Sequence, residues 1–193
     1  MAKKESTFVN MVLTLFLVCG IAAGALGYIY TITKEPIETA KKDFLYKQIN
    51  VVVPGADQGE IGEPIEKEGL KFYVVKDNSG QVIGTAVESF TESGFSGRFD
   101  IIVGFDQDGK ILDSNVLTHK ETPGLGDKMS KDVAPWNEQF KEKDPASYKL
   151  IVKKDGGDVD AITAATISSR GYCDALQKAY DGYMKFKNEG GIK

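Results

Sequence analysis

The sequence predicts an α+β fold in which a single N-terminal transmembrane helix precedes a domain built on an antiparallel sheet with flanking helices. Three observations lead to this prediction. Residues 11–30 are uncharged and mostly apolar, as a membrane span is. Residues 71–119 alternate β-branched and aromatic runs with turn residues, and residues 172–186 repeat apolar side chains at helical spacing.

The composition suits one membrane anchor and one compact domain, and it excludes several classes of function. The 193 residues are 41% hydrophobic and 27% charged, a balance typical of folded chains. A formal net charge of −4 argues against a basic surface for nucleic acid. Cys19, Cys173 and His119 are too few for an iron–sulfur cluster, a c-type haem or a structural zinc site. Redox activity would therefore depend on an organic cofactor, and no disulfide is expected.

The only sharp change in composition lies near residue 33, and it divides the chain into three expected parts. These are a cytoplasmic tip and transmembrane anchor over residues 1–33, a linking helix over 34–55 and an outer domain over 56–193. Lys3 and Lys4 precede the apolar segment, so the positive-inside rule predicts a cytoplasmic N-terminus and an extracytoplasmic domain. A signal peptide cleaved near Ala23-Gly24-Ala25 is the alternative.

Two helices are expected to flank the sheet. The first starts at Glu35-Pro36, because the first helical turn tolerates proline, and it ends at Pro54-Gly55. Its expected buried face comprises Ile37, Ala40, Phe44 and Val51. The second helix has Thr163 as its expected N-cap. Its single apolar stripe, expected to pack on the sheet, comprises Tyr172, Leu176, Ala179, Tyr183 and Phe186.

The sheet itself is expected to be an antiparallel meander of two β-hairpins. The expected strands cover residues 71–77, 81–88, 99–105 and 110–119, with turns at 78–80 and 106–109. Residues 149–153 are a further short strand candidate, and residues 155–158 form a turn before the last helix.

Residues 160–169, at the start of the last helix, are rich in hydroxyl groups and small side chains. With Thr163 as N-cap, the amides of residues 164–166 would be free donors at the positive end of the helix dipole. The hydroxyls of Thr163, Thr166 and Ser168 add further donors. This combination predicts a phosphate-binding helix terminus, and simple helix capping remains the alternative interpretation.

The same segment resembles the D-x-x-[ST]-G-A-T motif, in which a flavin transferase attaches FMN through its phosphate to the final threonine, here Thr166. Ala164 stands where that motif has glycine. Residues 119–128 resemble the H-x-E-T-P-G-L-G loop of the same family, and residues 94–97 resemble its G-[YF]-x-G segment. Over nearly its whole length the chain resembles the RnfG family of the Rnf electron-transport complexes, and more distantly NqrC of sodium-pumping NADH:quinone reductase.

The resemblance implies a membrane-bound flavoprotein that carries covalent phosphothreonyl-FMN at Thr166. Such a subunit relays electrons in an Rnf-type ferredoxin:NAD oxidoreductase that moves sodium ions or protons across the cell membrane. It has no catalytic residue, no metal site and no independent substrate catalysis. Its implied partners are the other membrane subunits, a flavin transferase and membrane lipid. A stand-alone extracytoplasmic flavoprotein and a flavin-free anchored interaction domain are the alternatives.

The cofactor-binding residues implied by the resemblance come from three patches of the sequence. They are Thr166, Thr163, Ala164, Ala165, Ser168, Glu121, Thr122, Leu125, Gly126, Gly94 and Phe95. Glu121 offers an acceptor for the flavin edge or for loop amides, and Gly126 is expected to let the backbone approach a planar ring. Trp136 is either a pocket wall or core, and His119 is either a structural residue or a proton donor.

Overall fold

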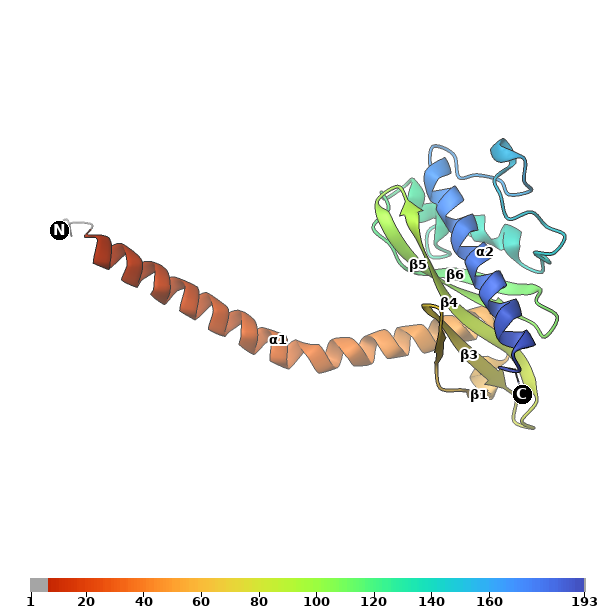
Figure 1. The fold of residues 1–193 in the computed structure, drawn as a ribbon, viewed down its shortest axis with the longest axis horizontal. Coiled ribbons are helices and arrows are strands. Elements are labelled where there is room, and N and C mark those ends of the chain that lie inside the picture. The colour runs from red at the N-terminus through yellow and green to blue at the C-terminus, as the bar shows by residue number, and fades with distance from the viewer. Residues whose placement is uncertain (1–6, 193) are drawn as a thin grey trace. The chain divides into compact units, whose positions relative to one another are not determined.

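The computed structural model describes residues 7–192, and residues 1–6 and 193 lie outside the described part. Lys3 and Lys4, on which the predicted orientation rests, are therefore outside it. By its contacts the chain divides into a unit that ends at Phe44 and a unit that begins at Leu45. Figure 1 shows the order of the helices and strands along the chain.

Helix α1 (Phe8–Val52) contains the one segment of residues 7–192 that is long and apolar enough to cross a membrane. The 18-residue window that defines this segment has a mean hydropathy of 2.2 and no buried residue. Pro36 lies inside α1, so the prediction that a separate linking helix begins at Glu35-Pro36 is wrong. Proline removes one main-chain hydrogen bond, and the bonds of the neighbouring turns are enough to continue the helix.

The end of α1 buries a different face from the one predicted. Gln48, Ile49 and Val52 are buried. The residues predicted to be buried are instead exposed, namely Ile37, Ala40, Phe44 and Val51. Apolar residues occur on more than one face of this segment, and contact with the sheet selects the face that is buried.

The sheet has six strands in the order β1-β3-β4-β5-β6, with β2 also paired to β3, and every pairing is antiparallel. The strands are β1 (Glu60–Ile61), β2 (Ile65–Lys67), β3 (Leu70–Lys76), β4 (Val82–Gly94), β5 (Gly97–Phe105) and β6 (Ile111–Thr118). The pairs β3–β4 and β5–β6 confirm both predicted hairpins. The sequence does not predict β1 and β2, because two or three residues are too few to show alternation.

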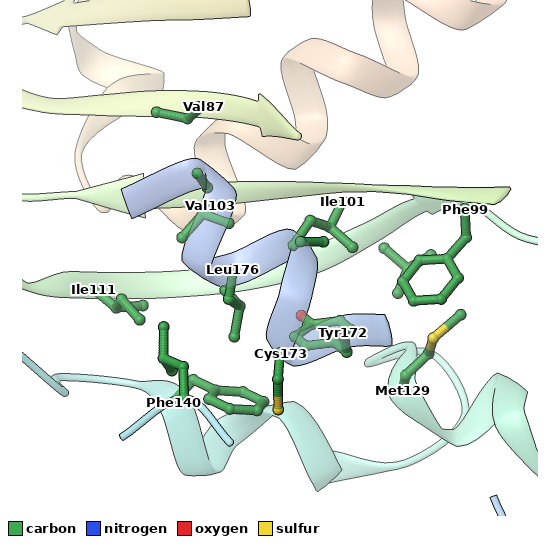
Figure 2. Packing of buried hydrophobic residues seen from close by; sticks show 14 of the residues in the cluster. Val87, Phe99, Ile101, Val103, Ile111, Met129, Phe140, Tyr172, Cys173 and Leu176 are labelled. Atoms are coloured by element: carbon green, nitrogen blue, oxygen red, sulfur yellow. The ribbon is translucent and has the colours of Figure 1, made fainter. Parts of the chain in front are cut away.

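Apolar clusters cover both faces of the sheet. On β5, Ile101 and Val103 belong to one cluster and Ile102 to the other, so the clusters lie on opposite faces. Helix α2 (Thr166–Asn188) covers the first face, and Figure 2 shows side chains of α2, the strands and the loops gathered there. The predicted stripe is confirmed, because Tyr172, Leu176, Ala179, Tyr183 and Phe186 are all buried. The end of α1 covers the second face through Ile49 and Val52.

The long connection between β6 and α2 contains short 3₁₀ turns and no strand. These turns are η2 (Gly126–Met129), η3 (Pro135–Phe140) and η4 (Lys153–Asp155), and η1 (Ala56–Gln58) follows α1. The predicted strand over 149–153 is wrong, because this segment contributes only an isolated bridge between Val152 and Val159. Asp158 accepts a hydrogen bond from the Lys149 amide at 2.8 Å, so the segment is satisfied within its own loop and does not join the sheet.

Candidate functional site

A cavity of about 290 Å³ lies where the β4–β5 hairpin tip, the loop after β6 and the start of α2 meet. It is lined by Phe95, Glu121, Thr122, Leu125, Gly126, Ala164, Ala165, Thr166, Ile167 and Ser168. Of the cofactor-binding residues expected from the sequence, all but Thr163 and Gly94 are among these lining residues. Ile167 is the lining residue that sequence reasoning missed, although its place directly after Thr166 is a signal that points to it.

The start of α2 lies further along the chain than predicted. The helix begins at Thr166 with Ala165 as its N-cap, and no side chain caps it. Thr163 is therefore not the cap, and it is exposed. The chain turns at residues 162–165, where the Ala165 amide donates to the Ile162 carbonyl at 3.0 Å. The chain therefore enters α2 through a tight turn, and no side-chain hydroxyl caps the helix.

The first amides of α2 belong to residues that line the cavity, and they have no protein partners within residues 7–192. Within residues 7–192, no hydrogen bond is formed by the amides of Thr166, Ile167 and Ser168. Free amides at a helix N-terminus attract anions, because the helix dipole places partial positive charge there. The half-exposed Thr166 lines the cavity beside these donors. The arrangement therefore suits a phosphate group at Thr166.

Ala164 adopts a backbone conformation that favours glycine. Its φ is 63°, in the left-handed region, at the position where the resembling motif has glycine. For a residue with a Cβ, this left-handed conformation costs about 1–2 kcal/mol relative to the right-handed one. The glycine of the motif would adopt this left-handed conformation without that cost.

Three apolar side chains surround the cavity and remain exposed. They are Phe95 at 66%, Leu125 at 40% and Ile167 at 47% exposure, and each comes from a different segment. Solvent-exposed apolar side chains gathered at one cavity are typical of a binding site. This rim suits a flat, largely apolar ring system.

Glu121 lies at the centre of the site and is only 5% exposed. Its Oε1 accepts a hydrogen bond from the Ser96 amide at 2.9 Å, and its Oε2 accepts one from Ser168 Oγ at 2.6 Å. The sequence predicts that this carboxylate accepts hydrogen bonds either from the flavin edge or from loop amides. The structure shows it bonded to a loop amide, that of Ser96. The Ser168 hydroxyl donates to Glu121, so it is not free to donate to an anion as predicted.

Gly126 lines the cavity and lies against the Glu121 carboxylate. A Cβ on Gly126 would lie 2.5 Å from Glu121 Oε2 and 2.6 Å from Ser168 Oγ. The protein's own side chains therefore already require glycine here, and the approach of a planar ring to its backbone stays a prediction.

Trp136 and His119, left open by the sequence, both have structural partners. Trp136 packs edge-on against Phe140 and Tyr172, and its Nε1 donates to the Asp160 carbonyl at 2.6 Å. His119 Nδ1 accepts a hydrogen bond from the Glu121 amide at 3.2 Å. Neither residue lines the cavity.

The two cysteines differ in burial, since Cys19 is exposed and Cys173 is buried. Both Cys19 and Cys173 are free. Burial raises the pKa of the Cys173 thiol to about 12, which keeps it protonated and unreactive at neutral pH. Within residues 7–192, no group of three or more His, Cys, Asp or Glu side chains is arranged to hold a metal ion.

Comparison with known proteins adds four findings. Residues 94–181 match the family described as FMN-binding domain. The chain is 34% identical to the RnfG protein of the ion-translocating oxidoreductase complex of Aliivibrio fischeri, over 93% of this chain and 91% of that protein. The corresponding protein of Vibrio vulnificus is 32% identical, over 91% of this chain and 87% of its own length. A solved structure, Shewanella oneidensis NqrC, is similar with a TM-score of 0.47 and 24% identity, over 67% of this chain and 66% of that one.

Proposed function

This chain belongs to the RnfG family of ion-translocating oxidoreductase complexes, and on that premise we propose that it is the FMN-bearing electron-transfer subunit of such a complex. Helix α1 anchors it in the membrane. The observation that supports this function most directly is the cavity, which combines free helix amides with an apolar rim.

The residues of the cavity fit the two chemically different ends of FMN. The phosphate carries negative charge, and the amides of residues 166–168 are donors at the positive end of a helix dipole. The isoalloxazine ring is flat and largely apolar, and Phe95, Leu125 and Ile167 provide apolar surface. When bound, FMN supplies the electron-transfer chemistry, while the protein binds, orients and encloses it.

We propose that the flavin is attached covalently, as a phosphoester on Oγ1 of Thr166. The Thr166 side chain lines the cavity, and within residues 7–192 its hydroxyl forms no hydrogen bond that attachment would break. Phosphorus gains a bond to Thr166 Oγ1 and loses its P–O bond to a leaving group, which departs together with the hydroxyl proton. The chain therefore gains the mass of FMN less one water. A flavin transferase would carry out this maturation step.

The proposed orientation places the N-terminus in the cytoplasm and the flavin domain outside, with lipid around the apolar part of α1. There the subunit would pass electrons between other membrane subunits of a ferredoxin:NAD oxidoreductase, which would move sodium ions or protons. Family membership favours this role over a stand-alone flavoprotein or a flavin-free interaction domain. Co-purification from membranes tests it, because a stand-alone flavoprotein would purify without polytopic subunits.

The attachment site is tested by intact mass and a peptide map of protein made in cells that express the flavin transferase. We expect the wild-type peptide containing Thr166 to gain FMN less one water. Thr166→Val keeps the β-branched shape and removes the nucleophilic oxygen, so it should carry no covalent flavin while its circular dichroism is unchanged. The matched control Thr39→Val changes an exposed threonine of α1 that lies outside both the cavity and the motif-like segment, and it should remain flavinylated. Covalent flavin in Thr166→Val would refute the assignment.

A further inference from the structure

We propose that Glu121 is a positioning residue of the flavin site: its buried carboxylate ties together the three segments that surround the cavity, and its negative charge lowers the midpoint potential of the bound flavin. The part that concerns the potential rests on the proposed function. The part that concerns the tie does not, because it can be measured on the protein without flavin.

The tie consists of hydrogen bonds to segments far apart in the sequence. Oε1 accepts from the Ser96 amide in the β4–β5 hairpin tip, and Oε2 accepts from Ser168 Oγ in the first turn of α2. The Glu121 amide donates to His119 Nδ1, which fixes the start of its own loop. One side chain thus links three segments that each line the cavity.

Three residues close to the Glu121 carboxylate each follow a residue of the apolar rim in the chain. Ser96 follows Phe95, Ser168 follows Ile167, and Gly126 follows Leu125 in the chain. Fixing the carboxylate against these neighbours therefore sets the spacing of the three rim side chains. This spacing determines the width that is available to a planar ring.

Two glycines make the room that the carboxylate occupies. A Cβ on Gly94 would collide with the Gly97 carbonyl oxygen and would also lie 2.8 Å from Glu121 Oε1. A Cβ on Gly126 would lie 2.5 Å from Glu121 Oε2. Real Cβ atoms do not approach other heavy atoms so closely. Gly94 does not line the cavity. It leaves room for the carboxylate of Glu121, which does line the cavity.

The charge of Glu121 has no cation to balance it. Among the ion pairs formed by residues 7–192, none includes Glu121. Both partners of its oxygens are donors, as an ionised carboxylate requires. A negative charge in a buried wall opposes the addition of an electron to a group beside it, and burial strengthens this effect by weakening solvent screening. The flavin's midpoint potential is lowered as a result.

Two variants separate the charge from the tie. Glu121→Gln has almost the same shape, still accepts from the Ser96 amide and can donate to Ser168 Oγ, but carries no charge. Glu121→Ala removes both the charge and the hydrogen bonds. Glu138→Gln is the matched control, since it removes the same charge from an exposed position outside the cavity.

The first measurement is a redox titration of the flavin in the full-length protein in detergent. We expect a more positive midpoint potential in Glu121→Gln than in the wild type, and no shift in Glu138→Gln. An unchanged midpoint in Glu121→Gln would overturn the electrostatic part of the proposal. A purely structural role for Glu121 would not move the potential of this isosteric variant.

The second measurement is amide hydrogen exchange of the peptide containing Ser96, on protein made without the flavin transferase. Glu121→Ala should exchange about tenfold faster there, through loss of a charge-assisted hydrogen bond, and Glu121→Gln should restore most of the protection. Wild-type exchange in Glu121→Ala would overturn the tie. If that variant does not fold, Ser168→Ala, which removes one donor and leaves the loop intact, should loosen the same peptide. A wild type without flavin in the presence of the transferase would refute the proposed function alone.

Discussion

Ala164 adopts a strained backbone conformation at the turn that leads into α2. The left-handed φ of 63° lets the chain turn from the connection into α2, so that Thr166 begins the helix at the cavity. Alanine tolerates this conformation poorly and glycine tolerates it freely. The departure from the motif therefore affects stability more directly than it affects the shape of the site.

We expect Ala164→Gly to raise the free energy of unfolding by about 1 kcal/mol, because it relieves the left-handed strain. Ala165 is the matched control, since its φ is −134° and glycine there relieves no strain, while it adds freedom to the unfolded chain and removes a buried methyl group. Urea denaturation followed by circular dichroism measures both. A loss of stability in Ala164→Gly comparable with that in Ala165→Gly would contradict the strain argument.

At the scale of elements, an ion pair joins the last 3₁₀ turn to α2. Arg170 Nε lies 2.6 Å from Asp155 Oδ2, and its second nitrogen donates to Oδ1 at 2.8 Å. This forked contact connects η4 with the first turns of the helix that carries Thr166. The Arg170 guanidinium holds the pKa of the Asp155 carboxyl below its ordinary value of 3.8.

This lowered pKa predicts a pH-dependent contribution to stability. A carboxyl with a depressed folded-state pKa stabilises the fold above its unfolded pKa, and the contribution is lost as the pH falls through the folded value. Asp155→Asn should therefore melt below the wild type at neutral pH, and the two should converge as the pH falls below 3.8. Asp132→Asn, at an exposed position, should melt like the wild type throughout. A difference that persists undiminished in acid would contradict the ion-pair explanation.

At the scale of the whole molecule, the end of α1 is part of the fold of the outer domain. Ile49, Val52 and Val53 are fully buried in the cluster on the second face of the sheet. A Cβ on Gly104 of β5 would lie 2.6 Å from the Val52 carbonyl carbon, so only glycine admits this packing. The contact-defined unit accordingly begins at Leu45.

We expect a fragment of residues 45–193 to be more stable than one of residues 56–193, the outer domain expected from composition. The shorter fragment loses the buried side chains of Ile49 and Val52, each worth about 1.5–3 kcal/mol. Urea denaturation of the two fragments measures the difference. Equal stability would show that the end of α1 contributes nothing to the domain.

Local patterns in the sequence were enough to predict much of this molecule. Alternation and turn residues predict β3 to β6, and helical spacing predicts the stripe of α2, because these signals depend on near neighbours along the chain. Two motif-like segments also point to the loop and the helix start that form the cavity. The strand expected at 149–153 is wrong, because local alternation does not show which partner a segment will have. Its hydrogen-bond partners lie within its own loop and not in the sheet.

Long-range packing accounts for what local patterns leave open. Which face of α1 is buried, and why Gly94 and Gly126 are glycines, depends on atoms from segments distant in sequence. The edge-on packing of Trp136 against Phe140 and Tyr172 also depends on residues distant in sequence. Propensity and periodicity depend on residues that are near one another in the sequence. Burial and close atomic approach depend on segments that only the folded chain brings together. The chain's local chemistry therefore specifies the parts of the proposed flavin site, and the packing of the sheet against α2 brings them together around Glu121.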